Sequence, residues 1–281
     1  MSGRHQHSRR LARIVRALRD GGIDAELVAT SAPGHATVLA RGAVRDGLEI
    51  VFGYGGDGTI REVAEGLVGS EVALGVLPGG TVNVVARAFA LTTNPVEAAR
   101  RQCRLEPRRI DVGICAGKPF LMQASSGPEA YAMHRLSATL KTRLGFLGAV
   151  VSSTASILRY PFPTIEVEAD GKKHEAKGAL VCNISELAGP FRLIPDGRFD
   201  DGRMELFLFK GKGLMDAAGF SIDLFLGNHM KRRDVEIHHV ERVVFTGPPG
   251  AFVQLDGDAL RDVPHPIELT LASKRLFALV A

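Results

Sequence analysis

The stretch that decides the fold is VFGYGGDGTIREVAEGL, residues 51–67. An apolar run enters four glycines and one aspartate, and the apolar residues after them recur at helical spacing. A strand that turns through glycines into a helix presents backbone N–H groups and the positive end of a helix dipole, and both bind phosphate. The stretch therefore predicts a phosphate loop at residues 55–59. A capping box formed by Thr59 and Glu62 is the alternative that needs no ligand.

The segments around this loop predict an α/β domain. A helix precedes Gly21-Gly22, and the alternation in IDAELVAT predicts a strand at residues 23–30. Further helices are expected at residues 35–47, 60–67 and 82–89, and strands at 48–53 and 72–78. Helices that alternate with short apolar strands predict a parallel sheet covered on both faces. Because the chain opens with a helix, the sheet is expected to lack its first strand.

The second half of the chain has a different pattern. Short strands separated by turns predict a mostly antiparallel β-sandwich, with turns at residues 116–118 and 170–171. A helical insertion is expected at residues 129–159. Its apolar stretch 144–158 is interpreted as a packed helix, with a lipid pocket or a membrane contact as the alternative. We predict two domains, residues 1–107 with 275–281 and residues 108–274.

Charge and composition limit the partners. The net charge is +4, and this mild basic balance suits nucleotides or anionic lipid headgroups. No apolar run is long enough to span a bilayer, and no nucleic-acid partner is expected. A group of basic residues near the start is interpreted as a solvated helix face: Arg4, Arg9, Arg10, Arg13, Arg16 and Arg19.

The glycines also spell the dinucleotide-binding fingerprint, as Gly53-x-Gly55-x-x-Gly58. That fingerprint needs an acid at the end of the following strand, where it binds a ribose hydroxyl. Here the following strand ends in LGVLPGG and has no acid, so the match to the fingerprint is interpreted as accidental. This second glycine turn opens another helix, with Thr81 at the expected N-cap. Two glycine-rich helix starts at neighbouring strand ends predict one crevice for a polyphosphate. Asp57 at its lip is placed to hold Mg²⁺ or to contact an acceptor hydroxyl.

Five segments in order resemble the diacylglycerol kinase catalytic family, which includes bacterial diacylglycerol-type lipid kinases and sphingosine and ceramide kinases. They are GGDGT (55–59), LPGGTVNVVAR (77–87), RIDVG (109–113), IPDGRFDDGRMELF (194–207) and VQLDGDAL (253–260). The resemblance covers most of the chain. It implies an N-terminal three-layer α/β nucleotide-binding domain and a C-terminal β-sandwich for the lipid substrate. It also implies ATP in the cleft between them and a last segment, RLFALVA, that returns to the first domain.

The resemblance implies an ATP-dependent lipid kinase, which transfers the γ-phosphate of Mg-ATP to a hydroxyl of a lipid such as diacylglycerol or a sphingoid base. It implies these nucleotide contacts: Thr30, Gly55, Gly56, Asp57, Gly58, Thr59, Ile60, Arg61, Glu62, Gly80, Thr81 and Asn83. Such a protein is expected in the cytoplasm, in peripheral contact with the inner face of the membrane.

The resemblance also implies catalytic and metal-binding residues. Asp258 takes the place of the family's general base, usually Glu, and Asp57 is the loop acid. A plain turn at Asp256-Gly257 is the alternative. A Mg²⁺ site is implied at the RFDDG stretch, with a carboxylate from Asp201 and backbone carbonyls from Arg198 and Arg203. An acidic turn without metal is the alternative there.

Three departures from the family pattern keep other functions open. The family opens with a strand and an Asn-Pro-x-Ser-Gly loop, whereas this chain starts as if cut within that loop. Val84 stands where the family often has Asp, and Arg61 where it often has Asn. A catalytically weak lipid- or nucleotide-binding relative is one alternative function. Another kinase with the GGDG motif, such as an NAD kinase, is the second.

Overall fold

The computed structural model describes residues 2–135, 157, 159–188, 191–195, 197–247, 252–261 and 263–281. The chain forms two compact units. The first unit is Met1–Ile110 with Lys274–Ala281, and the second unit is Asp111–Ser273. Most of the helical insertion expected at 129–159, including all but one residue of the apolar stretch 144–158, lies outside the described residues. In the described part of the chain, no helix has the length and hydropathy that crossing a membrane requires.

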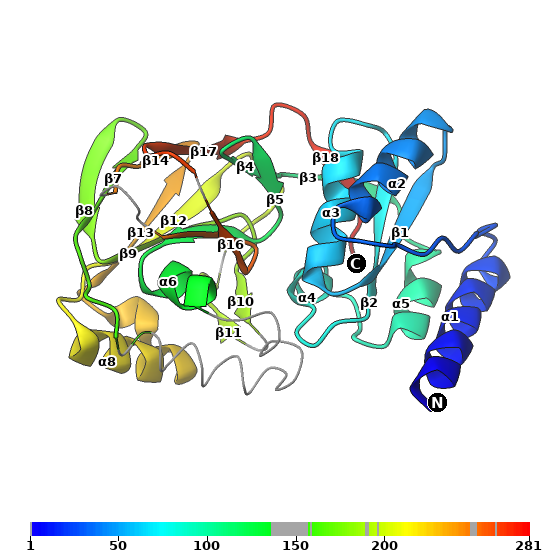
Figure 1. Ribbon diagram of the computed structural model, residues 1–281, viewed down its shortest axis with the longest axis horizontal. Helices are drawn as coiled ribbons and strands as arrows, with labels where there is room; N and C mark the ends of the chain where they lie inside the picture. The colour runs from blue at the N-terminus through cyan, green and yellow to red at the C-terminus, as the bar shows by residue number, and fades with distance from the viewer. Residues whose placement is uncertain are drawn as a thin grey trace. The chain divides into compact units, whose positions relative to one another are not determined.

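The sheet of the first unit has the order β1-β2-β18-β3 (Figure 1). Its strands are β1 (Ile50–Gly55), β2 (Ala73–Pro78), β18 (Leu276–Leu279) and β3 (Pro107–Ile110). The first three run parallel, and β3 runs antiparallel to β18. All six residues of β2 are buried, as expected for a strand that is covered on both faces. The last strand of the chain therefore lies inside the sheet of the first unit.

Helices cover both faces of this sheet. One layer contains α1 (Ser2–Asp20) and α5 (Pro95–Gln102), which pack with Leu77 of β2. The other contains α2 (His35–Arg45) and α3 (Asp57–Leu67). A Cβ at Gly53 of β1 would lie 2.8 Å from Ile60 of α3, so the missing side chain lets helix and sheet approach. The short α4 (Val84–Ala88) follows β2. The predicted three-layer α/β arrangement is confirmed.

The strand predicted at residues 23–30 is absent. These described residues adopt no regular secondary structure, and Leu27 and Val28 are 55% and 56% exposed. A strand requires a neighbour that completes its hydrogen bonds, and among the described residues β1 pairs with β2 alone. The alternating pattern of IDAELVAT indicates that one side of this segment is apolar. It does not show whether a neighbouring strand is present to pair with the segment. The prediction was wrong for this reason.

The second unit is a sandwich of two six-stranded antiparallel sheets. The order of the first is β13-β12-β9-β6-β15-β16, and that of the second is β5-β4-β17-β14-β7-β8. The strands of the first sheet are Val235–Val240, Met204–Phe209, Gly178–Cys182, Gln123–Ser126, Val253–Leu255 and Asp258–Leu260. Those of the second are Lys118–Phe120, Gly113–Cys115, Ile267–Leu271, Arg242–Phe245, Ile165–Ala169 and Lys172–Ala176.

One hydrophobic core joins the two sheets, with Leu206 and Val253 from the first and Phe120 and Phe245 from the second. The predicted hairpin turn at Asp170-Gly171 is confirmed, because both residues have positive φ, 46° and 80°. A small ribbon adds β10 (Glu186–Ala188) and β11 (Phe191–Arg192). The predicted fold class, an α/β domain followed by a β-sandwich, is therefore confirmed.

In the described part of the second unit, three helical segments have assigned bounds beside the sandwich. They are α6 (Pro128–Arg135), α8 (Leu214–Phe225) and the 3₁₀ turn η1 (His229–Lys231). The inner side of α8 covers a second core cluster that includes Phe207 and Phe209. Helix α8 was not predicted from the sequence.

Candidate functional site

The two glycine loops of the first unit are in backbone contact. Neighbouring parallel strands β1 and β2 place Gly55 opposite Pro78, and Gly79 N donates a hydrogen bond to Gly55 O at 2.7 Å. A Cβ at Gly80 would lie 2.6 Å from the Cα of Gly56. Glycine is therefore required at residue 80 because one backbone passes directly over the other. The structure brings both predicted loops to one edge of the sheet.

Asp57 ties the helices that follow the two loops. It is the first residue of α3, and its Oδ1 accepts a hydrogen bond from Val85 N, in the first turn of α4, at 3.0 Å. A carboxylate in the first turn is favoured by the partial positive charge of a helix N-terminus. Asp57 is only partly buried. Its charge is therefore fixed at the edge where the loops meet and remains accessible to solvent.

Asn83 fixes the second glycine loop. Its Oδ1 accepts from Gly80 N at 2.8 Å, and its Nδ2 donates to Gly80 O at 2.9 Å. Asn83 is the N-cap of α4 and has a φ of 53°, a left-handed conformation that asparagine tolerates. The prediction of Thr81 as N-cap was wrong, because the reciprocal bonds between Asn83 and Gly80 hold the turn and delay the helix to Val84. Thr81 is exposed.

The alternative of a capping box at the first loop was also wrong. The N-cap of α3 is Gly56, and Thr59 lies inside the helix. The carboxylate of Glu62 instead accepts hydrogen bonds from Gly34 N at 2.8 Å and Ala36 N at 3.3 Å. Glu62 therefore holds the start of α2, and the first amides of α3 have no side-chain cap. Those amides stay available to an anion.

The other predicted nucleotide contacts occupy different environments. Gly58 and Thr30 are exposed, whereas Ile60 is 2% exposed and packs beneath Gly53. Ile60 can therefore offer a ligand only its backbone. Arg61 is partly buried in the second turn of α3. Thr30 ends the segment that was wrongly predicted as a strand.

A cavity of about 400 Å³ adjoins the second glycine loop. Its lining includes Gly79, Gly80 and Asn83, together with Arg10 and Arg13 from α1. Two guanidinium groups beside a glycine loop make this cavity suitable for an anion. From the sequence, both arginines were expected on a solvated helix face. Their place in the lining depends on the packing of α1 against α5, which no local pattern reveals.

In the second unit, Asp256 and Asp258 have different roles. Asp256 and Gly257 form the two-residue turn between β15 and β16, with φ of 49° and 82°. The buried carboxylate of Asp256 accepts from the backbone N–H groups of residues 121, 122 and 123 at 2.9, 2.8 and 3.0 Å. Asp258 is exposed at the start of β16. Asp256 and Gly257 thus form a turn, and Asp258 directly after it stays exposed, so its role as the base stays a prediction.

A buried polar network supports this turn. Gln254 accepts a hydrogen bond from Gly257 N at 2.7 Å and donates one to Ser125 Oγ at 3.0 Å. Gln123 donates to Glu129 Oε1 at 2.9 Å, while Glu129 Oε2 is buried without a hydrogen-bond partner among the described residues. Burial raises the pKa of Glu129 to about 7, and the hydrogen bonds from Ser125 and Gln123 offset part of the effect. No motif in the sequence predicts a role for Glu129.

A further carboxylate, which was not among the predicted metal ligands, lies beside the predicted metal loop. Glu205 lies on β12 and is 1% exposed. Its Oε1 accepts from Arg198 N at 3.4 Å, and its Oε2 has no hydrogen-bond partner in the described part of the chain. Asp201 accepts from Arg203 N at 3.1 Å. Arg198, Asp201 and Arg203 are thus held on one loop beside a buried acid.

The electrostatics of this loop suit a hard cation. Burial raises the pKa of Glu205 to about 7, the hydrogen bond from Arg198 N lowers it in part, and the charge of Asp201 raises it further. Ser185 Oγ is also buried without a partner among the described residues, and a Cβ on Gly197 would lie 2.2 Å from it. A buried acid with an orphaned oxygen, near a second acid and backbone carbonyls, fits Mg²⁺ chemistry.

Another group of possible metal ligands has its own counter-charge. His174, Glu236 and His238 offer ligand atoms within 4.8 Å of one another, on the edge strands β8 and β13. Glu236 forms an ion pair with Lys210 at 2.5 Å, and this hydrogen bond lowers the pKa of Glu236. For Glu205 the corresponding contact is with His239 at 3.9 Å, a residue that is charged only when protonated. The loop with Glu205 therefore has the greater need of a cation.

Comparison with known proteins identifies both units. Residues 1–115 match the family model of the diacylglycerol kinase catalytic domain. Residues 123–277 match that of the YegS C-terminal NAD kinase beta sandwich-like domain. The chain is 28% identical to a diacylglycerol kinase of Bacillus subtilis (strain 168), over 92% of this chain and 86% of that protein. It is 24% identical to the diacylglycerol kinase of Staphylococcus carnosus (strain TM300), over 92% and 85%.

Solved structures show the same fold. The crystal structure of a diacylglycerol kinase from Bacillus anthracis str. Sterne superposes with a TM-score of 0.73 at 20% identity, over 98% of this chain and 91% of the other. An NAD kinase from Archaeoglobus fulgidus in complex with ATP superposes with a TM-score of 0.54 at 12% identity, over 96% and 88%. At these identities the likeness speaks for fold alone. With both units matched in order, the chain belongs to the family that joins a diacylglycerol kinase catalytic domain to a YegS-type C-terminal β-sandwich.

Proposed function

We propose that this protein is an ATP-dependent lipid kinase that transfers the γ-phosphate of Mg-ATP to a hydroxyl group of a lipid such as diacylglycerol or a sphingoid base. One observation carries the proposal. Two glycine loops are in backbone contact at the carboxyl ends of β1 and β2, within the residues that match the diacylglycerol kinase catalytic domain. The curated relatives are named diacylglycerol kinase, which supports a lipid as the acceptor.

The first unit supplies the phosphate site. The amides at the start of α3 and the backbone of Gly79 and Gly80 bind the phosphates, and Arg10 and Arg13 add positive charge in the adjoining cavity. Catalysis of phosphoryl transfer consists mainly of positioning and charge stabilisation, so fixed backbone donors and arginines suffice for much of it. Asp57, held by Val85 N, orders Mg-ATP and the acceptor hydroxyl. The ATP complex of the NAD kinase with this fold supports ATP as the donor.

Asp258 of the second unit is the general base. The acceptor oxygen forms a bond to the γ-phosphorus as its proton passes to the Asp258 carboxylate, the bond from that phosphorus to the bridging oxygen breaks, and ADP leaves. Asp258 is exposed, which an approaching substrate requires. Asp256 keeps the turn rigid through its three backbone hydrogen bonds. Aspartate is one methylene shorter than the family's usual glutamate, so the hydroxyl has to approach the hairpin closely.

A Mg²⁺ ion in the second unit would be held by Asp201, the backbone carbonyls of Arg198 and Arg203, and Glu205. Bound there, the ion would neutralise the acids of this loop and so stabilise the fold of the second unit. We further propose that the enzyme works in the cytoplasm and meets its substrate by peripheral contact with the membrane.

The test is transfer of labelled γ-phosphate from Mg-ATP to acceptors in detergent micelles. The panel contains diacylglycerol, a sphingoid base, phosphatidylglycerol and, as a separate acceptor in solution, NAD. Label on a lipid, lost in the Asp258→Asn variant, supports the proposal and names the substrate class. Label on NAD alone would favour an NAD kinase. ATP binding without transfer to any acceptor would favour a catalytically weak binding protein.

A further inference from the structure

Helix α8 of the second unit is hydrophobic on two opposite sides. On the inner side, the ring centroid of Phe220 lies 5.6 Å from that of Phe207 and 5.5 Å from that of Phe209. Leu224 packs on the same cluster. A helix that is hydrophobic all round is normally buried. The outer side of α8 is nevertheless exposed, so its composition needs another explanation.

The exposed side of α8 carries no charged residue. Met215 is 83% exposed, Ile222 61% and Leu226, the C-cap, 62%. With 100° between successive residues, one arc of about 140° holds all the exposed positions. These positions are Leu214, Met215, Ala218, Ser221, Ile222, Phe225 and Leu226. The one polar member, Ser221, donates its hydroxyl to Ala217 O at 2.9 Å, within the helix.

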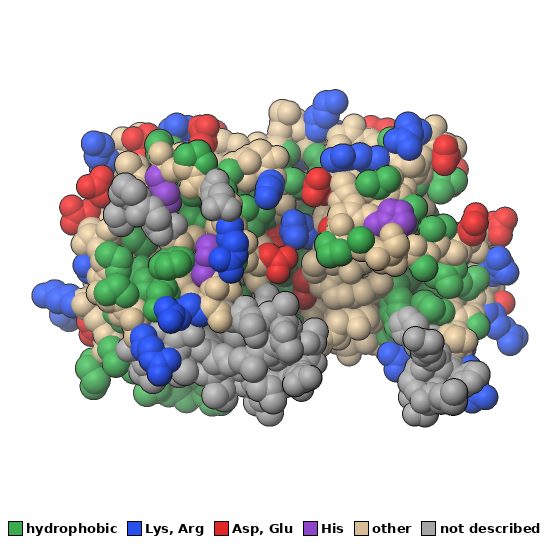
Figure 2. Space-filling view, viewed as in Figure 1, with side chains coloured by type: hydrophobic (Ala, Val, Ile, Leu, Met, Phe, Trp, Pro, Cys, Tyr) green, Lys and Arg blue, Asp and Glu red, His purple; other side chains and the backbone are tan. Residues whose placement is uncertain are grey.

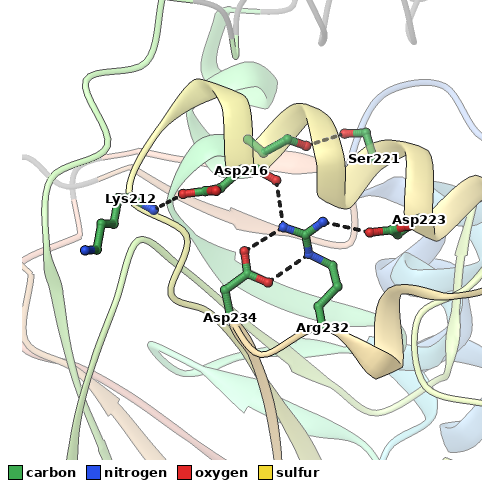
Figure 3. A network of polar contacts seen from close by, with 7 residues as sticks. Lys212, Asp216, Ser221, Asp223, Arg232 and Asp234 are labelled. Carbon is green, nitrogen blue, oxygen red and sulfur yellow. Dashed lines mark hydrogen bonds and ion pairs between the residues drawn. The ribbon is translucent and has the colours of Figure 1, made fainter.

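The acids of this region are held away from that arc (Figure 3). Arg232 donates to Asp223 at 2.7 Å and to both oxygens of Asp234 at 2.8 and 2.7 Å. Asp216 accepts from Lys212 N at 2.7 Å. Both acids of α8 therefore lie on its flank and are occupied by donors of the protein. The exposed arc keeps neither a negative charge nor a hydroxyl donor that is unused.

Basic residues border the same surface. Lys212 precedes α8, while Lys231 and Arg233 follow it, and all three are exposed. Met230 beside them is 43% exposed. In the space-filling view, hydrophobic and basic side chains gather together over α8 at the lower left (Figure 2). An apolar strip with a basic border is complementary to a bilayer whose surface carries anionic headgroups.

We propose that the outer face of α8 docks on a bilayer that contains anionic lipid, with Met215, Ile222 and Leu226 in the interfacial region and the basic border on the headgroups. A bilayer fits better than a protein partner because protein interfaces also exchange hydrogen bonds, and this arc offers no unused side-chain donor and only the Ser221 hydroxyl oxygen as an acceptor. The inference rests on the proposed function, since an enzyme that acts on a membrane lipid needs such a contact.

The experiment measures binding of the full-length protein to vesicles without ATP. Vesicles of phosphatidylcholine with about 30% phosphatidylglycerol, which gives them a negative surface potential, are compared with vesicles of pure phosphatidylcholine by sedimentation. The double variant Ile222→Gln/Leu226→Gln should bind at least about tenfold more weakly than the wild type, because two large apolar side chains no longer enter the interface. Lys231→Glu/Arg233→Glu should lose the preference for phosphatidylglycerol.

A matched control has equally exposed apolar residues elsewhere. Val38 and Leu48 of the first unit are 58% and 52% exposed, so Val38→Gln/Leu48→Gln removes a similar surface and should bind as the wild type does. The chain has no tryptophan, so Met215→Trp introduces a single fluorophore on α8. Its emission should shift to shorter wavelength on mixed vesicles, whereas that of Leu48→Trp should not. Circular dichroism verifies that each variant is folded.

Two results would overturn the inference. They are wild-type binding that Ile222→Gln/Leu226→Gln leaves unchanged, and a wild type that stays in the supernatant with mixed vesicles. Phosphate transfer in detergent micelles is measured in parallel, because it needs no bilayer. Docking through α8 without transfer in micelles would refute the kinase and keep the membrane contact. Transfer in micelles without α8-dependent binding to vesicles would support the kinase and refute the membrane contact through α8.

Discussion

The amide of Val85 donates to the carboxylate of Asp57 at 3.0 Å, and this bond joins the first turns of α3 and α4. It links two loops that are 28 residues apart in the chain. Asp57 therefore both stabilises the contact between the two helices and lies at the proposed phosphate site. Substitutions can separate the two, because an amide retains the acceptor oxygen while it removes the charge.

We expect Asp57→Asn to keep wild-type stability and to lose transfer by a factor of about 100 or more, since a fixed charge at the reacting phosphate is removed. Asp57→Ala should lose transfer and also about 1 kcal/mol of stability, because Val85 N loses its acceptor. Urea unfolding and phosphate transfer measure the two effects. Wild-type transfer by Asp57→Asn would remove this charge from the mechanism.

Glycine substitutions test the contact between the loops. Gly80→Ala should destabilise the first unit and abolish ATP binding, because its Cβ would lie 2.6 Å from the Gly56 Cα. Gly42→Ala in α2 is the matched control, since a Cβ there would lie 3.8 Å from its nearest neighbour, a guanidinium nitrogen of Arg45, and away from both glycine loops. Alanine should raise its stability by up to about 1 kcal/mol through helix propensity. Calorimetric titration with ATP measures the affinity of each variant, and thermal unfolding measures its stability. Equal ATP affinity of Gly80→Ala and wild type would contradict the proposed phosphate site.

Glu205 should make stability depend on pH. Its folded pKa, about 7, lies above the ordinary 4.5, so its favourable contribution is full below pH 4.5 and is lost as pH rises through 7. That loss corresponds to about 3 kcal/mol at most. Mg²⁺ should restore stability at pH 8 in the wild type and fail to do so in Glu205→Gln. Urea unfolding at pH 5 and 8, with Mg²⁺ or a chelator, measures both effects.

Glu129→Gln is the control for this experiment. The pKa of Glu129 is also raised to about 7 by burial, so its substitution should reduce the same pH dependence. It is absent from the proposed metal loop, and its variant should keep the wild-type response to Mg²⁺. A response that disappears in both variants would place the cation elsewhere.

The two aspartates of the β15–β16 turn should separate stability from activity. Asp256→Ala should cost about 3 kcal/mol or more, because three backbone N–H groups lose a charged acceptor. Asp258→Asn should keep stability within about 0.5 kcal/mol, as an exposed substitution, and lose transfer. Asp258→Glu should retain transfer. Full activity of Asp258→Asn would exclude it as the base.

The sequence predicted most of the fold because local patterns specify it. The apolar β2, the glycine turns at both loops and the Asp170-Gly171 hairpin follow from periodicity and turn chemistry. The strand at 23–30 failed because its formation depends on a neighbouring strand, and Thr81 failed as N-cap because Asn83 bonds back to Gly80. Both errors come from contacts that a propensity does not contain.

The candidate site was predictable only in part. The glycine loops and Asp57 have sequence signatures, whereas Arg10 and Arg13 reach the cavity through the packing of α1. Glu205 left one weak signal, an acid inside the otherwise apolar run Met204–Phe209. Glu129 left none, since its burial depends on β6 and on α6 together. Helix α8 was missed because residues 214–226 are apolar on both sides and so lack a clear helical period.

The position of β18 between β2 and β3 has a consequence for synthesis of the protein. A ribosome that has released residues 1–110 has delivered β1, β2 and β3 without the strand that joins β2 to β3. The glycine loops are made early, yet the sheet that carries them closes only when the last residues of the chain emerge. The last sandwich strand, β17, ends only a few residues before β18 begins, so the first unit cannot complete its sheet ahead of the second, as an N-terminal domain usually does.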